Sequence, residues 1–115
     1  MKPEERAVEL VAKAIVKYAG SVMGPVALHH VRNVDGVQIG KRSVRLLKRN
    51  RKIIDEIISS YQGIMGEAVK GIVIMAVTSE LKKHPDLYPY FRKVLPSWVF
   101  DAPDVRVLEL AGHVW

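Results

Sequence analysis

The segment 64–77 constrains the fold of this chain more than any other part of the sequence. Positions 72–77 are six consecutive apolar residues, so a helix here would have almost no polar face. A helix of that kind has to be buried on every side. With 115 residues, the chain is long enough to build one domain around such a core. The sequence therefore predicts a single helical domain over residues 1–115, with this helix at its centre.

Further helices are expected on both sides of this segment. Pro3 and the two glutamates after it form a typical helix start, because proline suits the first turn and acidic side chains suit the positive end of the helix dipole. Apolar residues then recur at three- and four-residue spacing to about Ala19. Pro25 interrupts the pattern, since it removes a backbone donor. The other helices are expected at about 26–33, 43–60, 62–83 and 87–94.

Two short strands complete the predicted fold. The Asp35-Gly36 pair is a turn signal ahead of a brief apolar run at 37–39, and residues 105–110 alternate between apolar and polar. The second strand would pair with the first or with another subunit. We therefore expect a mainly α fold, a compact helical bundle of four or five helices with a short C-terminal β-strand.

The apolar segment also predicts an assembly. A bundle of three or four helices leaves part of an all-round apolar helix uncovered, so another copy of the chain would have to cover this helix or the C-terminal strand. A homo-oligomer, most simply a twofold dimer, is the expected result.

Residues 18–26 and 61–69 resemble each other weakly. Each segment begins with a tyrosine, contains two glycines and ends with a valine, provided that one position is skipped. Coincidence among common small residues and an internal duplication both explain the resemblance. In either case, the glycines are expected where two helices pack unusually close.

The positive charge of the chain is concentrated in residues 41–52. Seven of these twelve residues are Lys or Arg, and none is acidic. The whole chain has 18 basic and 12 acidic residues, so the remainder is nearly neutral. Charge that only aids solubility is usually spread over a surface with both signs mixed. The local excess therefore favours a surface that faces a polyanion.

On a helix, these cations would form a row opposite an apolar face. The row would have no acidic neighbours at helical spacing, and its first members would lie at the positive end of the helix dipole, which disfavours them. Such a costly arrangement favours a function, here non-catalytic binding of DNA or RNA phosphates with little sequence preference. The predicted nucleic-acid-binding residues are Lys41, Arg42, Arg45, Lys48, Arg49 and Lys52.

The alternative is a homo-oligomeric protein-interaction or scaffold module without nucleic-acid binding. In that case the cationic face is solvated, and its long side-chain stems cover apolar neighbours. The segment 88–100 is the other candidate binding surface, since it holds five of the eight aromatic residues with Arg92 and Lys93 among them. These aromatic side chains either stack on unpaired bases or cap an open end of the helical bundle.

No residues indicate an enzyme, a metal site or a cofactor. The segment 36–43 resembles a phosphate-binding loop only superficially, because its spacing between glycines is one residue short. His29 and His30 are adjacent and would point about 100° apart on a helix, and the chain has no cysteine to complete a site. Glu67 lies in an apolar helix and is expected to pair with Lys70 or a neighbouring helix rather than act as a general base.

The composition sets the remaining expectations. The chain has no cysteine, only four Asn or Gln residues and abundant Lys, Arg and Val, a pattern typical of a thermophilic source. Its N-terminus is charged, and its most apolar run is far shorter than the roughly 20 residues of a membrane span. We therefore expect a cytoplasmic protein that does not insert into membranes.

Overall fold

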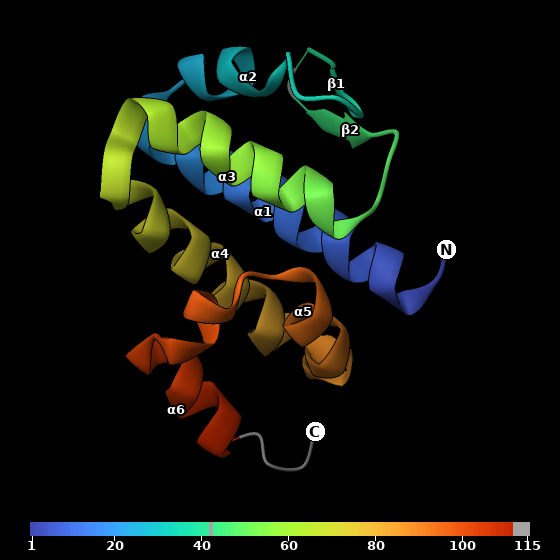
Figure 1. Ribbon diagram of the computed structural model, residues 1–115, viewed down its shortest axis with the longest axis vertical. Coiled ribbons are helices and arrows are strands. Elements are labelled where there is room, and N and C mark those ends of the chain that lie inside the picture. The colour runs from blue at the N-terminus through green and yellow to red at the C-terminus, as the bar shows by residue number, and fades with distance from the viewer. Residues whose placement is uncertain (42, 112–115) are drawn as a thin grey trace.

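The computed structural model is mainly helical and describes residues 1–41 and 43–111 (Figure 1). Within that part of the chain there are six helices and one two-stranded antiparallel sheet, so the mainly α fold is confirmed with slightly more helices than expected. No helix in these residues is both long enough and apolar enough to cross a membrane. The elements are α1 (Pro3–Met23), α2 (Val26–Val31), β1 (Val37–Ile39), β2 (Val44–Leu46), α3 (Arg51–Met65), α4 (Val69–Lys83), α5 (Tyr88–Val94) and α6 (Pro103–Ala111), with short 3-10 helices at Gly66–Ala68, Pro85–Leu87 and Ser97–Asp101.

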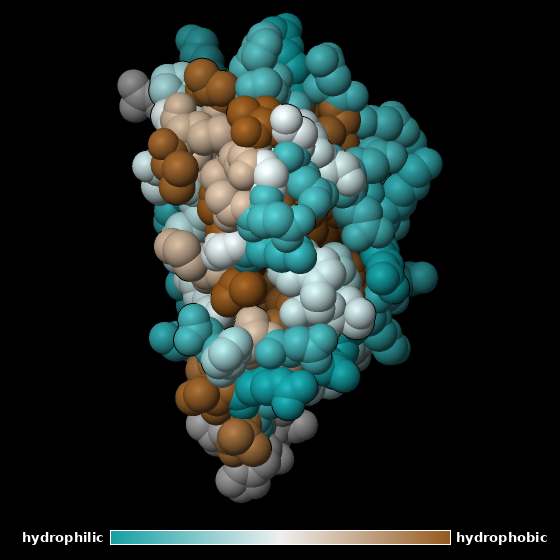
Figure 2. All heavy atoms as spheres, turned by 60° about the vertical axis from the view of Figure 1, so that its left-hand side comes forward, coloured by the Kyte–Doolittle hydropathy of each residue, from teal (hydrophilic) through white to brown (hydrophobic). Residues whose placement is uncertain are grey.

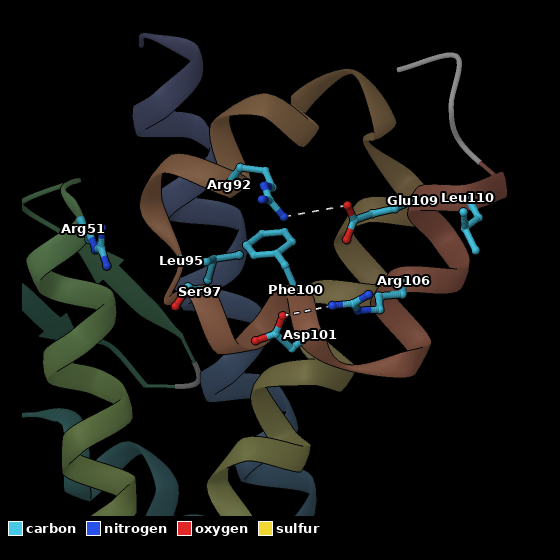
Figure 3. A pocket seen from close by; sticks show the side chains of 9 residues that line it. All are labelled: Arg51, Arg92, Leu95, Ser97, Phe100, Asp101, Arg106, Glu109 and Leu110. Carbon is cyan, nitrogen blue, oxygen red and sulfur yellow. Dashed lines mark hydrogen bonds and ion pairs between the residues drawn. The ribbon is translucent and has the colours of Figure 1, made fainter.

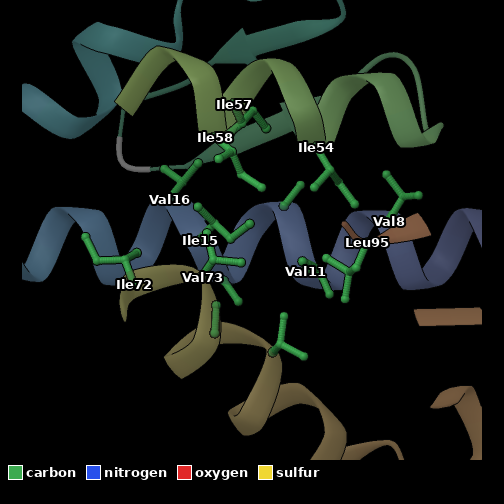
Figure 4. Packing of buried hydrophobic residues seen from close by; sticks show 14 of the residues in the cluster. Val8, Val11, Ile15, Val16, Ile54, Ile57, Ile58, Ile72, Val73 and Leu95 are labelled. Carbon is green, nitrogen blue, oxygen red and sulfur yellow. The ribbon is translucent and has the colours of Figure 1, made fainter. Parts of the chain in front are cut away.

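Helix α1 lies at the centre of the hydrophobic core. It starts as predicted, with Pro3 and two glutamates in its first turn. Its inner side includes Val8, Val11 and Ile15, and none of these three side chains is exposed. Figure 4 shows α1 between α3 and α4, with isoleucine and valine side chains of both neighbours directed at it. The central position expected for the segment 64–77 therefore belongs to α1.

Helix α4 is covered less completely than the sequence predicts. Val73 and Val77 are fully buried, and α1, α3 and α6 all pack against this helix. The remaining side is open, because Met75 is 54% exposed and Gly71 is exposed as well. The expectation of a helix buried on every side is wrong. A second copy of the chain is therefore not required to bury α4, and the dimer stays a prediction.

One glycine of each of the two similar segments ends a helix, and the other lies inside that helix. Gly24 follows α1 with φ 70° and ψ −149°, and Gly66 follows α3 with φ 60° and ψ −138°. Each amide donates to the carbonyl oxygen four residues earlier. The weak sequence resemblance therefore corresponds to two helix ends of the same geometry. The predicted close packing is wrong, because a Cβ added at Gly20 or Gly63 would meet no neighbouring element within 4 Å in the described chain.

Residues 43–49, predicted as the start of a helix, form a strand and a loop instead. Strand β1 is present as predicted, but its partner is β2, with Arg45 opposite Gln38 in an antiparallel pair. Val44 and Leu46 are buried while Arg45 between them is exposed. This alternation is typical of a strand with one face on the core.

Helix α3 begins at Arg51 because Asn50 caps it. The Oδ1 atom of Asn50 accepts a hydrogen bond from the Ile53 amide at 3.2 Å, which satisfies one free donor of the first turn. The cap leaves Leu47 in the preceding loop, where it is 60% exposed. The helix expected at about 43–60 is therefore correct only from residue 51 onward.

The predicted C-terminal strand at 105–110 is wrong, because these residues belong to α6. Pro103 and Asp104 occupy the first turn of this helix, where proline and an acidic side chain both stabilise it. Val105 is fully buried and Leu108 is partly buried, whereas the other apolar residues of this segment are exposed. The buried residues are three positions apart, which is a helical spacing.

The aromatic segment 88–100 mostly closes one end of the core. Phe91 and Phe100 are buried, and Phe100 meets Tyr88 edge to face with 6.2 Å between ring centroids. Trp98 is partly exposed, with the Lys70 ammonium 5.7 Å from its ring centroid. These contacts favour the structural interpretation of the segment over stacking on bases.

Candidate nucleic-acid interface

The predicted nucleic-acid-binding residues lie on the β-hairpin and on the loop that joins it to α3 (Figure 1). They do not share one helix face, so the expected helical row of cations is wrong. Arg42 falls outside the described residues. The others are Lys41 in the hairpin turn, Arg45 on β2, Lys48 and Arg49 in the loop after β2, and Lys52 in the first turn of α3.

Two of these cations are paired with carboxylates that are distant in the sequence. Lys48 Nζ donates to Asp35 at the start of the hairpin, and this hydrogen bond and the opposite charge lower the pKa of Asp35 and raise the pKa of Lys48. Arg49 Nη2 lies 3.2 Å from Glu9 Oε1 on α1, in a partly buried pair. Both carboxylates are distant in the sequence, so the lack of acidic neighbours at helical spacing does not leave Lys48 and Arg49 unpaired. The expectation of no acidic neighbours at helical spacing is wrong at Lys52, whose partner Glu56 lies four positions further on.

The cations at the start of α3 are paired more loosely. Arg51 Nε lies 3.9 Å from Asp55 Oδ2, and Lys52 Nζ lies 3.8 Å from Glu56 Oε1, each one helical turn further on. Both basic side chains are largely exposed, and pairs of this kind contribute little to stability. The first turn of α3 also contains no acidic residue, although acidic side chains are favoured there.

Lys41 and Arg45 are the most available of the described cations of the stretch. Both are exposed, and in the part of the chain that the structure describes neither has an acidic partner within 4.0 Å. Lys17 of α1 is exposed and has no such partner in these residues either. It lines a groove of about 380 Å³ whose other wall includes Ser43 and Val44 of the hairpin.

Sequence reasoning missed the contribution of α1 to this surface. Lys13 and Lys17 lie four residues apart and so share one face of a helix, but nothing local to them indicates that the hairpin lies beside that face. Lys13 is paired with Glu9 at 3.6 Å, which is also the partner of Arg49. Only the tertiary fold places these residues together.

A second group of cations lines a cleft of about 560 Å³, here named the arginine cleft. Its arginines come from three elements: Arg51 from α3, Arg92 from α5 and Arg106 from α6. Figure 3 shows Arg92 beside Phe100, the pair of Asp101 and Arg106 next to them, and Arg51 across the cleft on α3. The sequence gives no signal for this group, because its members are spread over more than fifty positions.

The adjacent histidines of α2 and Glu67 have identifiable neighbours. The described residues contain no group of three or more His, Cys, Asp or Glu side chains placed to hold a metal ion. The rings of His29 and His30 meet edge to face, 5.8 Å apart. Glu67 Oε2 lies 2.7 Å from Lys70 Nζ and its side chain is 73% exposed, which confirms the predicted pairing.

Two hydroxyl groups of α3 hold α2 in place and so position the hairpin that follows it. Tyr61 Oη donates to the Ala27 carbonyl oxygen at 2.8 Å, and Ser60 Oγ donates to the His30 carbonyl oxygen at 2.6 Å. Burial raises the pKa of Tyr61 to about 12. These residues have a structural role, because both hydroxyls are already engaged by backbone acceptors.

Comparison of the chain with protein families, with curated proteins and with solved structures found no match. We therefore infer function from the geometry and charge of the residues described above.

Proposed function

We propose that this protein binds nucleic acid without catalysing a reaction, and that the β-hairpin and the adjacent side of α1 contact the phosphates. The observation that best supports this proposal is the exposure of Lys41 and Arg45 without acidic partners among the described residues. Lys17 adds a third cation of the same kind across a groove from the hairpin. Cations of this kind bind phosphates because the nucleic acid then releases condensed counterions.

The other cations of the basic stretch contribute less than the sequence predicts. Phosphates have to compete with a carboxylate for Lys48, Arg49 and Lys52. Arg49 is the least available, since it is only 29% exposed and holds the loop against α1. Lys52 is 80% exposed and its ion pair is long, so it is the most available of the three.

We expect little sequence preference. Lysine and arginine side chains on a short hairpin contact phosphates more readily than base edges, and phosphate contacts convey no sequence information. Each strand of the hairpin has three residues, or about 10 Å of length, which is too short to read several base pairs from a groove.

Binding of the protein to labelled duplex DNA, single-stranded DNA and structured RNA at low salt tests the proposal. The double variant Lys41→Gln/Arg45→Gln should weaken binding to every nucleic acid that the wild type binds. The control Arg6→Gln/Lys82→Gln removes the same charge from exposed positions on α1 and α4 and should change binding less. Absence of wild-type binding on the order of tens of micromolar, or equal losses in the two double variants, would contradict the proposal.

A homo-oligomeric protein-interaction module is the second candidate, and exposed apolar side chains favour it. Figure 2 shows two apolar groups on one face of the molecule, separated by a hydrophilic band. Exposed apolar residues include Val22 near the end of α1, Ile64 near the end of α3 and Met75 on α4. A dimer should give about twice the mass of the chain by light scattering. A monomer at micromolar concentration would remove this candidate in its homo-oligomeric form.

A further inference from the structure

We propose that the arginine cleft is a binding site for a nucleoside monophosphate group, separate from the hairpin surface. In this site the guanidinium group of Arg92 stacks on the base, Arg106 binds the phosphate, and Asp101 accepts a hydrogen bond from the ribose. The cleft of about 560 Å³ falls within the range of about 300–1,000 Å³ that is usual for small-molecule sites.

The base-stacking surface is the outer side of the Arg92 guanidinium. Its Cζ atom lies 4.6 Å from the ring centroid of Phe100, so the guanidinium covers that ring (Figure 3). Phe100 is buried and also has an edge-to-face contact with Tyr88. The Arg92 side chain itself is 50% exposed. A planar, weakly hydrated guanidinium group stacks well on nucleobases, and here it is held in place before a ligand arrives.

The phosphate would lie beside Arg106, with Arg51 across the cleft as a more distant positive charge. The Nη2 atom of Arg106 lies 3.3 Å from Asp101 Oδ1, and the Nε atom of Arg51 lies 3.9 Å from Asp55 Oδ2. A guanidinium group has five N–H donors, so these contacts leave most of them for a ligand. Arginine binds phosphate oxygens with two parallel hydrogen bonds, which fixes the orientation of the group. The two side chains approach from α6 and α3, on opposite sides of the cleft.

The two carboxylates in the cleft favour a nucleotide over a simple anion. Asp101 and Glu109 line the cleft together with the three arginines, so the ionised groups sum to one positive charge. These carboxylates repel any phosphate group, and a nucleotide offsets this repulsion because its ribose hydroxyl can donate to one of them, as it does in dinucleotide-binding proteins. Asp101 is the more available of the two because Glu109 already accepts a hydrogen bond from Tyr88 and pairs with Arg92 at 3.8 Å.

Calorimetric titration of the full chain with adenosine monophosphate, ribose 5-phosphate and inorganic phosphate tests the site. Stacking on Arg92 should make adenosine monophosphate bind about tenfold or more tightly than ribose 5-phosphate, since one stacked base contributes about 1–3 kcal/mol. Inorganic phosphate should bind most weakly of the three. Equal affinities for the three ligands, or no binding of adenosine monophosphate, would overturn the proposal.

Two substitutions assign the roles within the cleft. Arg92→Lys keeps the positive charge but removes the planar guanidinium group. The affinity for adenosine monophosphate should therefore fall by about fivefold or more, and the affinity for ribose 5-phosphate should stay nearly unchanged. Arg106→Gln should lower the affinity for both ligands. Arg6→Gln, an exposed arginine outside the cleft, is the control. Melting temperatures equal to that of the wild type would show that both variants are folded. If both folded variants then bind adenosine monophosphate with unchanged affinity, the assignment is overturned.

The same chemical group is presented by a free nucleotide and by an unpaired nucleotide of a single strand. If a short single-stranded oligonucleotide binds more tightly than adenosine monophosphate, and if Arg92→Lys abolishes this difference in affinity, the ligand of the site is a nucleic-acid strand. Equal affinities would support the site with a free nucleotide. Lys41→Gln/Arg45→Gln should leave adenosine monophosphate binding unchanged, so failure of the hairpin proposal and failure of the cleft proposal are distinguishable.

Discussion

Replacing glycine by alanine at Gly24 and at Gly20 should change the stability of the protein in opposite directions. Gly24 has φ 70° and ψ −149°, close to a region that is almost exclusive to glycine, so alanine there should cost about 1–3 kcal/mol. Gly20 lies inside α1, where alanine is preferred over glycine by about 0.5–1 kcal/mol. Among residues 1–41 and 43–111, a Cβ would meet no neighbouring element within 4 Å at either position, so new contacts do not affect the comparison.

Helix α3 offers the same comparison a second time. Gly66 ends the helix with φ 60° and ψ −138°, and Gly63 lies within it, again with open space around both. Urea unfolding followed by circular dichroism should separate the two members of each pair by about 1.5–4 kcal/mol in the free energy of unfolding. Equal stabilities within a pair, or a gain on substitution at Gly24 or Gly66, would refute the assignment of these glycines as conformational requirements.

Three further substitutions test other parts of the structure. Val73→Asp puts an unpaired charge at a fully buried position and should unfold the protein. Met75→Asp, at a 54% exposed position, should leave the melting temperature nearly unchanged. A Val73→Asp variant that is folded and as heat-resistant as the wild type would contradict the assignment of Val73 to the core. Burial raises the pKa of Tyr61 from 10.0 to about 12, so its contribution to stability is complete below pH 10 and is lost as the pH rises through about 12. Urea unfolding should show that the free energy of unfolding falls less steeply at alkaline pH in Tyr61→Phe than in the wild type. An equal pH dependence in the two proteins would contradict the burial of the hydroxyl. Asp35→Asn frees Lys48 and should steepen the salt dependence of nucleic-acid binding by about one unit, whereas an unchanged slope would place Lys48 outside the interface.

The helices with clear start signals and long periodic patterns could be predicted from the sequence. Pro3 with its glutamates marked the start of α1, and the apolar run of α4 marked a helix that does pack on the core. The degree of burial could not be predicted, because it depends on which helices lie beside α4. Helix α6, hidden in a segment of strand-like alternation, supplies cover that the sequence did not reveal.

The basic stretch shows why a short pattern can be misread. Val44 and Leu46 fit a strand, while Val44 and Leu47 fit a helix, so spacing alone does not decide between them. The deciding signal was Asn50, a favoured helix cap directly before Arg51. The same ambiguity affected residues 105–110, where Pro103 and Asp104 indicated a helix start.

The candidate site could be predicted as a set of residues but not as a surface. The concentration of charge pointed to Lys41 and Arg45, which are exposed and available. The partners of Lys48 and Arg49 are 13 and 40 positions away, and no local pattern indicates contacts over such separations. The contribution of Lys17 likewise requires knowledge of how α1 and the hairpin pack.

The slope of log affinity against log salt concentration on duplex DNA tests the proposed interface most directly. Each phosphate contact contributes about −0.9 to this slope. Contacts from Lys17, Lys41 and Arg45 alone give about −3, whereas six contacts from the basic stretch would give about −5. Lys41→Gln/Arg45→Gln should reduce the slope to about −1, while Arg6→Gln/Lys82→Gln should leave it near −3. The same slope for the wild type and the hairpin variant would contradict binding through the hairpin.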